Sequence, residues 1–84
     1  MSKVIFVSMP SCGSCRKLQN AMDYAGIEVD EHKVIDPSNK EDLNFAQKYK
    51  LQTFPTLLKL DDNGQELGRL CGLQPLSKIK DFIE

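Results

Sequence analysis

The hydrophobic pattern changes its period between Pro10 and Cys15, and this change limits the folds open to the chain. Val4 to Ser8 is apolar on both alternate faces, which is typical of a strand buried at the centre of a sheet. Beyond it, apolar residues recur every three or four positions, as on one stripe of an amphipathic helix. They are Cys15, Leu18, Met22 and Ala25. Gly26 then closes the helix, because it has no Cβ to oppose a left-handed cap.

The segment from Ile27 to Ile35 predicts a second strand. Its apolar members are Val29, Val34 and Ile35. Four charged or polar residues, Asp30 to Lys33, interrupt them, so we expect an exposed strand at the edge of the sheet.

A second helix is predicted after Asp36-Pro37. Ser38 is followed three residues later by Glu41, a spacing that favours a capping box in which each side chain accepts from the other's backbone N–H. We expect this helix to continue to about Tyr49. Its inward residues should be Leu43, Ala46 and Tyr49.

The last third of the chain predicts a hairpin and a helix. Asn63-Gly64 favours a two-residue type I′ turn, which would join strands at Thr56–60 and Glu66–71 in antiparallel fashion. Pro75 suits the first turn of a final helix, since its missing N–H has no partner there in any case. One face of that helix carries Leu76, Ile79 and Ile83.

These elements follow one another in the order β-α-β-α-β-β-α. A helix joins the first two strands, which must therefore be parallel, whereas the last two form a hairpin. The fold class is α/β, with a four-stranded mixed sheet flanked by three helices. With 84 residues the chain should be a single domain over residues 1–84, and only about 60 to 65% of its unfolded surface can be buried at that size.

Charge and hydropathy exclude several classes of function. The 11 basic and 12 acidic residues give a net charge of -1 with no long block of either sign, so we expect no nucleic-acid partner. The apolar run from Val4 to Val7 is too short for the apolar region of a signal peptide or for a membrane span. We therefore expect a cytoplasmic monomer that does not bind membranes.

Cys12 and Cys15 carry the chemistry that the sequence predicts. Cys12 lies at the first turn of a helix, where unpaired N–H groups and the helix dipole favour the thiolate and lower the pKa of the thiol. Residues three apart on a helix have Cα atoms about 5 to 6 Å apart, within the range of an unstrained disulfide. Cys15 falls on the buried stripe, so we assign Cys12 as nucleophile and Cys15 as resolving cysteine. Gly13 and Ser14 are small and leave the attacking sulfur uncovered.

The combined motifs resemble the thioredoxin and glutaredoxin superfamily over essentially the whole chain. They are the Cys12-Gly13-Ser14-Cys15 motif, the Thr53-Phe54-Pro55 turn before a hairpin, and the hairpin's Gly64 and Gly72. The resemblance implies a thioredoxin fold, with Pro55 in the cis form facing the disulfide and the Phe54 backbone pairing with an extended substrate segment. It also implies that Cys71 lies on the rim of the substrate groove. The expected substrate-binding residues are Gly13, Ser14, Phe54, Pro55, Cys71 and Gly72.

Within the superfamily the sequence combines features of two branches. Gly13 and the closing hairpin resemble thioredoxin, and the Gly-Gly-x-Asp-Asp segment that binds glutathione in glutaredoxins is missing after Leu70. In contrast, Ser11 stands where thioredoxins have Trp, and Phe6 replaces their buried Asp. We expect a thioredoxin-like electron donor that reduces protein disulfides, ribonucleotide reductase among them, with thioredoxin reductase or glutathione as the electron source. The alternatives are a glutathione-dependent glutaredoxin and a non-enzymatic binding or metal module.

The remaining chemistry-bearing residues are Cys71 and His32. Tetrahedral zinc would need two more ligands beside Cys12 and Cys15, and these two are not paired in sequence, so we expect no metal and no cofactor. His32 is expected to lie idle on a partly exposed strand, or else to accept a proton beneath Cys15. For Cys71, a small buried hydrophobe is the alternative to the groove rim.

Overall fold

The computed structural model describes residues 2–84, and these residues form the predicted order of strands and helices. The four-stranded sheet has the order β2-β1-β3-β4. β1 pairs in parallel with β2 and antiparallel with β3, and β3 pairs antiparallel with β4, so the sheet is mixed as expected. The elements are β1 (Lys3–Ser8), α1 (Gly13–Tyr24), β2 (Glu31–Val34), α2 (Lys40–Lys48), β3 (Thr56–Leu60), β4 (Glu66–Cys71) and α3 (Leu76–Ile83).

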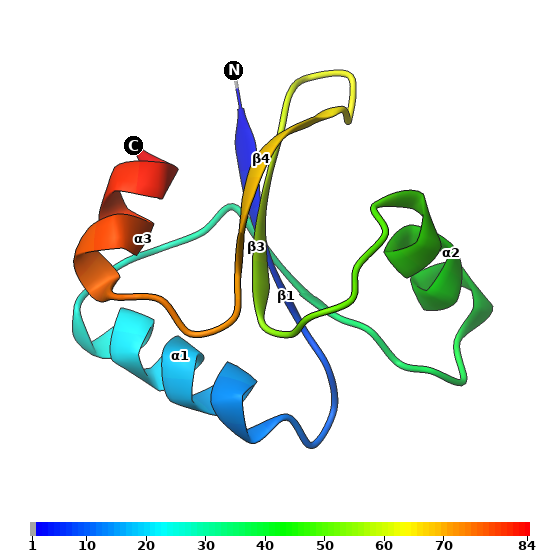
Figure 1. The fold of residues 1–84 in the computed structure, drawn as a ribbon, viewed down its shortest axis with the longest axis horizontal. Helices are drawn as coiled ribbons and strands as arrows, with labels where there is room; N and C mark the ends of the chain where they lie inside the picture. Colours follow the sequence, from blue (N-terminus) through cyan, green and yellow to red (C-terminus); the bar gives the residue numbers. More distant parts are fainter. Residues whose placement is uncertain (1) are drawn as a thin grey trace.

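The helices cover both faces of the sheet. Figure 1 shows α1 and α3 on one face and α2 on the other. β1 lies inside the sheet, and every residue from Val4 to Ser8 is buried, because alternate side chains enter the two opposite cores. This confirms the central strand that an uninterrupted apolar run predicted.

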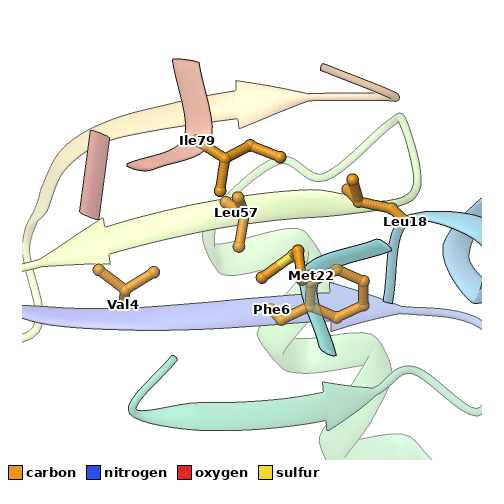
Figure 2. Packing of buried hydrophobic residues seen from close by; sticks show 6 residues of the cluster. All are labelled: Val4, Phe6, Leu18, Met22, Leu57 and Ile79. Carbon is orange, nitrogen blue, oxygen red and sulfur yellow. The ribbon is translucent and has the colours of Figure 1, made fainter. Parts of the chain in front are cut away.

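The core beneath α1 and α3 consists of buried side chains from four elements. Figure 2 shows Phe6 of β1 next to Met22 of α1, with Leu57 of β3 and Ile79 of α3 in the same cluster. The whole buried cluster is Val4, Phe6, Leu18, Met22, Leu57 and Ile79. Leu18 and Met22 come from the predicted stripe of α1, which is confirmed except at Ala25. That residue is exposed, because the helix ends at Tyr24 and the chain turns away at Gly26, whose φ is +72°.

The core beneath α2 draws mainly on the sheet and on the segments that flank this helix. Its buried residues are Ile5, Val7, Ile35, Tyr49, Leu58 and Leu60. No residue within Lys40–Lys48 is buried, and the helix contributes Phe45 and Ala46 only in part. The prediction that Leu43 points inward is therefore wrong, since its side chain is 41% exposed and Phe45 occupies the contact instead.

The predicted capping box at the start of α2 is also wrong. The N-cap is Asn39, whose side-chain oxygen accepts from the Asp42 N–H at 3.1 Å. Ser38 donates both its N–H and its hydroxyl to Asp36, at 2.9 and 2.7 Å, so it is not available as a cap. A turn around an Asp side chain competes with the cap here, because both satisfy a backbone donor equally well.

The hairpin is confirmed, whereas the two-residue turn within it is not. β3 and β4 have the predicted bounds, but five residues, 61–65, separate them, and of Asn63 and Gly64 only the glycine has a positive φ. The carboxylate of Asp61 accepts from the N–H groups of Asn63 and Gln65, both at 2.9 Å. These hydrogen bonds favour the longer loop over the type I′ turn.

Two other boundaries differ from the sequence prediction. β2 is the edge strand expected, but it is shorter than Ile27–35, and Val34 within it is 49% exposed. Asp30 lies just ahead of it, and its carboxylate accepts from the N–H of Val4 at 2.8 Å. Pro75 is the N-cap of α3, one residue before the predicted first turn. None of the helices in residues 2–84 is both long and apolar enough to cross a membrane.

Candidate active site

Cys12 and Cys15 form a disulfide at the N-terminus of α1. Their Cα atoms are 5.2 Å apart, within the range predicted for this spacing on a helix. Cys12 is the N-cap, with φ −93° and ψ 107°, and α1 begins at Gly13. The change of hydrophobic period predicted a junction between a strand and a helix here. This junction places both sulfurs at the end of the sheet where β1 stops.

The two cysteines differ in their access to solvent. Cys15 is 3% exposed and belongs to the buried stripe of α1, whereas Cys12 is half-buried. Gly13 is exposed, and a Cβ built on it would have no atom within 4 Å, so the space beside Cys12 is open. A partner molecule can reach Cys12 from this side, and Cys15 is covered by its own helix and the sheet.

The surroundings of the Cys12 sulfur favour negative charge. The N–H of Cys15 points at the sulfur from 3.2 Å, and the Ser14 hydroxyl oxygen lies 3.6 Å from it. The first turn of α1 holds no acidic residue to oppose the helix dipole. The sequence predicted the dipole but not the Ser14 contact, for which the motif gives no signal beyond the presence of a hydroxyl.

Three connections meet at this end of the sheet. Figure 1 shows that the chain leaves β1, enters β3 and leaves β4 on the same side. The strand register agrees, because Thr56 pairs with Val7 of β1 and with Cys71 of β4. Sequence segments more than forty residues apart are in this way assembled around the dithiol motif.

The segment before β3 has the backbone that the resemblance implied. The Phe54-Pro55 peptide bond is cis, and Pro55 is buried. Its carbonyl accepts from the N–H of Gly72 at 2.8 Å, and the Thr56 hydroxyl donates to the carbonyl of Thr53. Gly72 has a φ of +75°, which a residue with a side chain rarely adopts. The hydrogen bond between Gly72 and Pro55 links two residues that are predicted to bind substrate, one just after β4 and the other just before β3.

Cys71 is a free and exposed cysteine, so the alternative of a small buried hydrophobe is wrong. Leu70, its neighbour, faces the other way and packs against the α1 and α3 core. Hydrogen bonds to the Glu66 carboxylate raise the pKa of the nearby Arg69, which therefore stays fully charged. The position of Cys71 beside Gly72 is the one predicted for the groove rim, and its role in binding stays a prediction.

His32 lies away from the dithiol motif. Its ring packs edge-on against Phe6, with ring centroids 4.8 Å apart. It lines a shallow cavity of about 250 Å³ between α1 and β2 whose walls include Met22 and Asp23 but neither Cys12 nor Cys15. Among residues 2–84 no group of three or more His, Cys, Asp or Glu side chains could hold a metal ion.

The turn before Cys12 contains a backbone conformation that the sequence does not predict. Ser11, directly before Cys12, has a φ of +59°, in the left-handed region that residues other than glycine and asparagine seldom occupy. It reverses the chain between Pro10 and the helix, so that Cys12 begins α1 at the surface. Serine at this position gives no reason to expect it.

Comparisons with known proteins agree with this geometry. A family model described as a thioredoxin-like domain matches residues 2–84. A protein disulfide-isomerase from Zea mays is 26% identical over 81 residues, covering 89% of this chain, and the chain spans only 16% of that relative's length.

Solved structures of thioredoxins have the same fold. The thioredoxin of Fasciola hepatica is 27% identical, with a TM-score of 0.73 over 98% of this chain and 77% of its own. The thioredoxin of Malassezia sympodialis is 23% identical, with a TM-score of 0.73 over 98% of this chain and 71% of its own. A thioredoxin from Thermus thermophilus is 16% identical, with a TM-score of 0.74, and the match covers 98% of this chain and 70% of that one.

Proposed function

The chain belongs to the thioredoxin-like family, and on this premise we propose that it reduces protein disulfides by dithiol exchange through Cys12 and Cys15. One observation carries the proposal: the two cysteines are joined at a helix N-terminus with Cys12 open to a partner and Cys15 covered. A metal or purely structural pair would not need this difference in access.

The geometry supports a two-step exchange. In the reduced protein the Cys12 thiolate attacks a substrate disulfide, one S–S bond breaks, and a mixed disulfide forms while the substrate's first sulfur leaves and takes up a proton. Cys15 then loses its proton and attacks the Cys12 sulfur, which closes the Cys12–Cys15 disulfide and releases the second substrate thiol. Two electrons pass to the substrate.

The contacts around the Cys12 sulfur favour its thiolate in the reduced protein. The Cys15 N–H and the Ser14 hydroxyl are placed to stabilise negative charge on this sulfur before it attacks the substrate disulfide. In the second step Cys12 carries the sulfur that Cys15 attacks, and the substrate thiolate is the leaving group, so these contacts act on the first attack. Ser14 therefore assists the first step in this proposal.

For the source of electrons we propose a thioredoxin reductase. Gly13 and the closing hairpin support this choice, and the residues after Leu70 read Cys-Gly-Leu-Gln-Pro, without the acidic pair that would hold glutathione. Ribonucleotide reductase is the protein substrate that the family resemblance suggests, and a cytoplasmic setting would keep the pair reduced.

An assay pair tests both parts of the proposal. With NADPH and a thioredoxin reductase the protein should precipitate insulin by reducing its disulfides, and with glutathione it should act only weakly on glutathione mixed disulfides. The Cys12→Ser variant is the control and should be inactive in both. Efficient turnover with glutathione alone would place the chain with the glutaredoxins, and failure with both reductants would leave a binding module.

A further inference from the structure

The surface next to Cys12 carries two cations that have no partner among residues 2–84. Arg16 and Lys17 of α1 are exposed, and neither forms a hydrogen bond through its side chain or an ion pair with any residue in 2–84. The nearest acidic residue along α1 is Asp23, about two helical turns beyond Arg16. No residue in 2–84 therefore neutralises this positive charge beside the site, and it is open to a bound partner.

Two cations on the strands of the sheet are paired with carboxylates. Lys33 of β2 lies 3.2 Å from the Asp42 carboxylate, and Arg69 of β4 lies 2.6 Å from Glu66. Arg16 and Lys17 have no carboxylate partner among residues 2–84, and they directly follow the Cys12–Cys15 pair in the chain.

Arg16 is also placed to meet a bound substrate. It is four residues from Cys12, and its N–H donates to the Cys12 carbonyl at 3.2 Å, so the two residues are one helical turn apart on the same side of α1. Helical side chains tilt toward the N-terminus, which directs the guanidinium along the surface toward Cys12. Cys15, in contrast, lies on the buried stripe.

We propose that Arg16, supported by Lys17, selects protein disulfides that have acidic residues beside the reacting cysteine. This inference rests on the proposed reductase function and narrows its substrate class. An Asp or Glu next to the substrate sulfur would lie over the α1 rim when that sulfur reaches Cys12. Complementary charge of this kind acts mainly on the rate of encounter and is screened by salt.

The test uses three synthetic peptides of equal length, each closed by one disulfide. They differ only at the two positions flanking the reacting cysteine, which are both Glu, both Gln or both Lys. The protein is reduced with dithiothreitol, freed of reductant, and mixed with each peptide in a stopped-flow instrument. The Glu peptide should react about three- to ten-fold faster than the Lys peptide at low salt, and the ratio should fall toward one at 0.5 M NaCl.

Two double variants of equal charge change decide whether α1 is responsible. Arg16→Gln/Lys17→Gln should bring the Glu-to-Lys rate ratio within about two-fold of one. Lys78→Gln/Lys80→Gln removes the same charge from α3, where Lys80 lies near Gly26 and Glu28 at the far end of α1, and should keep the wild-type ratio.

The outcomes separate this inference from the proposed function. Reduction of the Gln peptide reports the reductase activity itself, and the ratio between charged peptides cancels any change in the reactivity of Cys12. Equal rates for the Glu and Lys peptides, or an equal loss of preference in both double variants, would overturn the inference while leaving the reductase proposal standing. No reaction with any peptide would instead contradict the reductase proposal.

Discussion

The two faces of the sheet hold their helices in different ways. On one face α1 and α3 insert side chains that are almost wholly buried, such as Met22 at 4% exposure and Ile79 at 0%. On the other, α2 buries no residue of its own and is held through the partly buried Phe45, the flanking Tyr49 and polar contacts. The helix that carries the dithiol is on the firmly packed face, which keeps Cys12 and Cys15 in fixed positions.

The largest effect should come from removing a buried side chain on the face of the sheet that α1 and α3 cover, the firm face. Ile79→Ala should lower the free energy of unfolding by about 3 kcal/mol, because the side chain is fully buried and its loss leaves a cavity. Leu43→Ala on α2 removes a side chain that is 41% exposed and should cost less than about 1 kcal/mol. Urea unfolding of the oxidised proteins measures both. Equal losses would contradict the difference between the faces.

Sequence patterns predicted the firm face better than the loose one. Leu18, Met22 and Ile79 were placed correctly, because side chains that are buried within a helix recur with its period, whereas Ala25 lies beyond the end of α1 and is exposed. At α2 the burial is partial, so the pattern did not distinguish Leu43 from Phe45 as the inward residue.

The errors at loops have a common physical cause. Asp36 and Asp61 accept backbone N–H groups, and these hydrogen bonds are alternatives to the capping box and the type I′ turn. Within the site, the cysteine pair and the cis proline followed from the motif and the resemblance. The left-handed backbone of Ser11 and the contact between the Ser14 hydroxyl and the Cys12 sulfur depend on tertiary packing, and no local sequence pattern predicts them.

A smaller loss of stability is expected from removing a polar contact on the face of the sheet that α2 covers, the loose face. The hydroxyl of Tyr49 donates to the Gly64 carbonyl at 2.7 Å, so Tyr49→Phe should lower the free energy of unfolding by about 1 kcal/mol. Tyr24→Phe is the matched control, since Tyr24 is 95% exposed and should change nothing measurable. A similar loss in both variants would mean that the Tyr49 hydroxyl does not anchor this side.

Acid should weaken the start of α2. The backbone N–H of Asp36, with Lys33 further off, holds the pKa of Asp42 below its ordinary value of 3.8. A lowered pKa stabilises the fold fully above the ordinary value, and this contribution is lost as the pH falls through the lower, folded value. Asp42→Asn keeps an acceptor oxygen but removes the charge, so the melting temperatures of the two proteins should differ above pH 5 and converge only as the pH falls below 3.8 and through the lower, folded pKa of Asp42. A constant difference across this range would argue against the ion pair.

The smallest effect should be that of the third cysteine on catalysis. Cys71 is exposed and does not lie at a helix N-terminus, and the two-step exchange does not use it. Cys71→Ala should keep insulin reduction within about two-fold of the wild type, a change in barrier below about 0.5 kcal/mol. A ten-fold loss in a folded variant would make Cys71 part of the redox cycle.

The most direct test of the division of labour between the two cysteines is to trap the intermediate. Reduced Cys15→Ser and Cys12→Ser proteins are each mixed with a disulfide substrate, and the adducts are identified by mass spectrometry after acid quenching. Cys15→Ser should accumulate a mixed disulfide on Cys12, because the resolving thiol is missing, and Cys12→Ser should form almost none, because Cys15 is 3% exposed. Faster or greater adduct formation on Cys15 than on Cys12 would contradict the assignment.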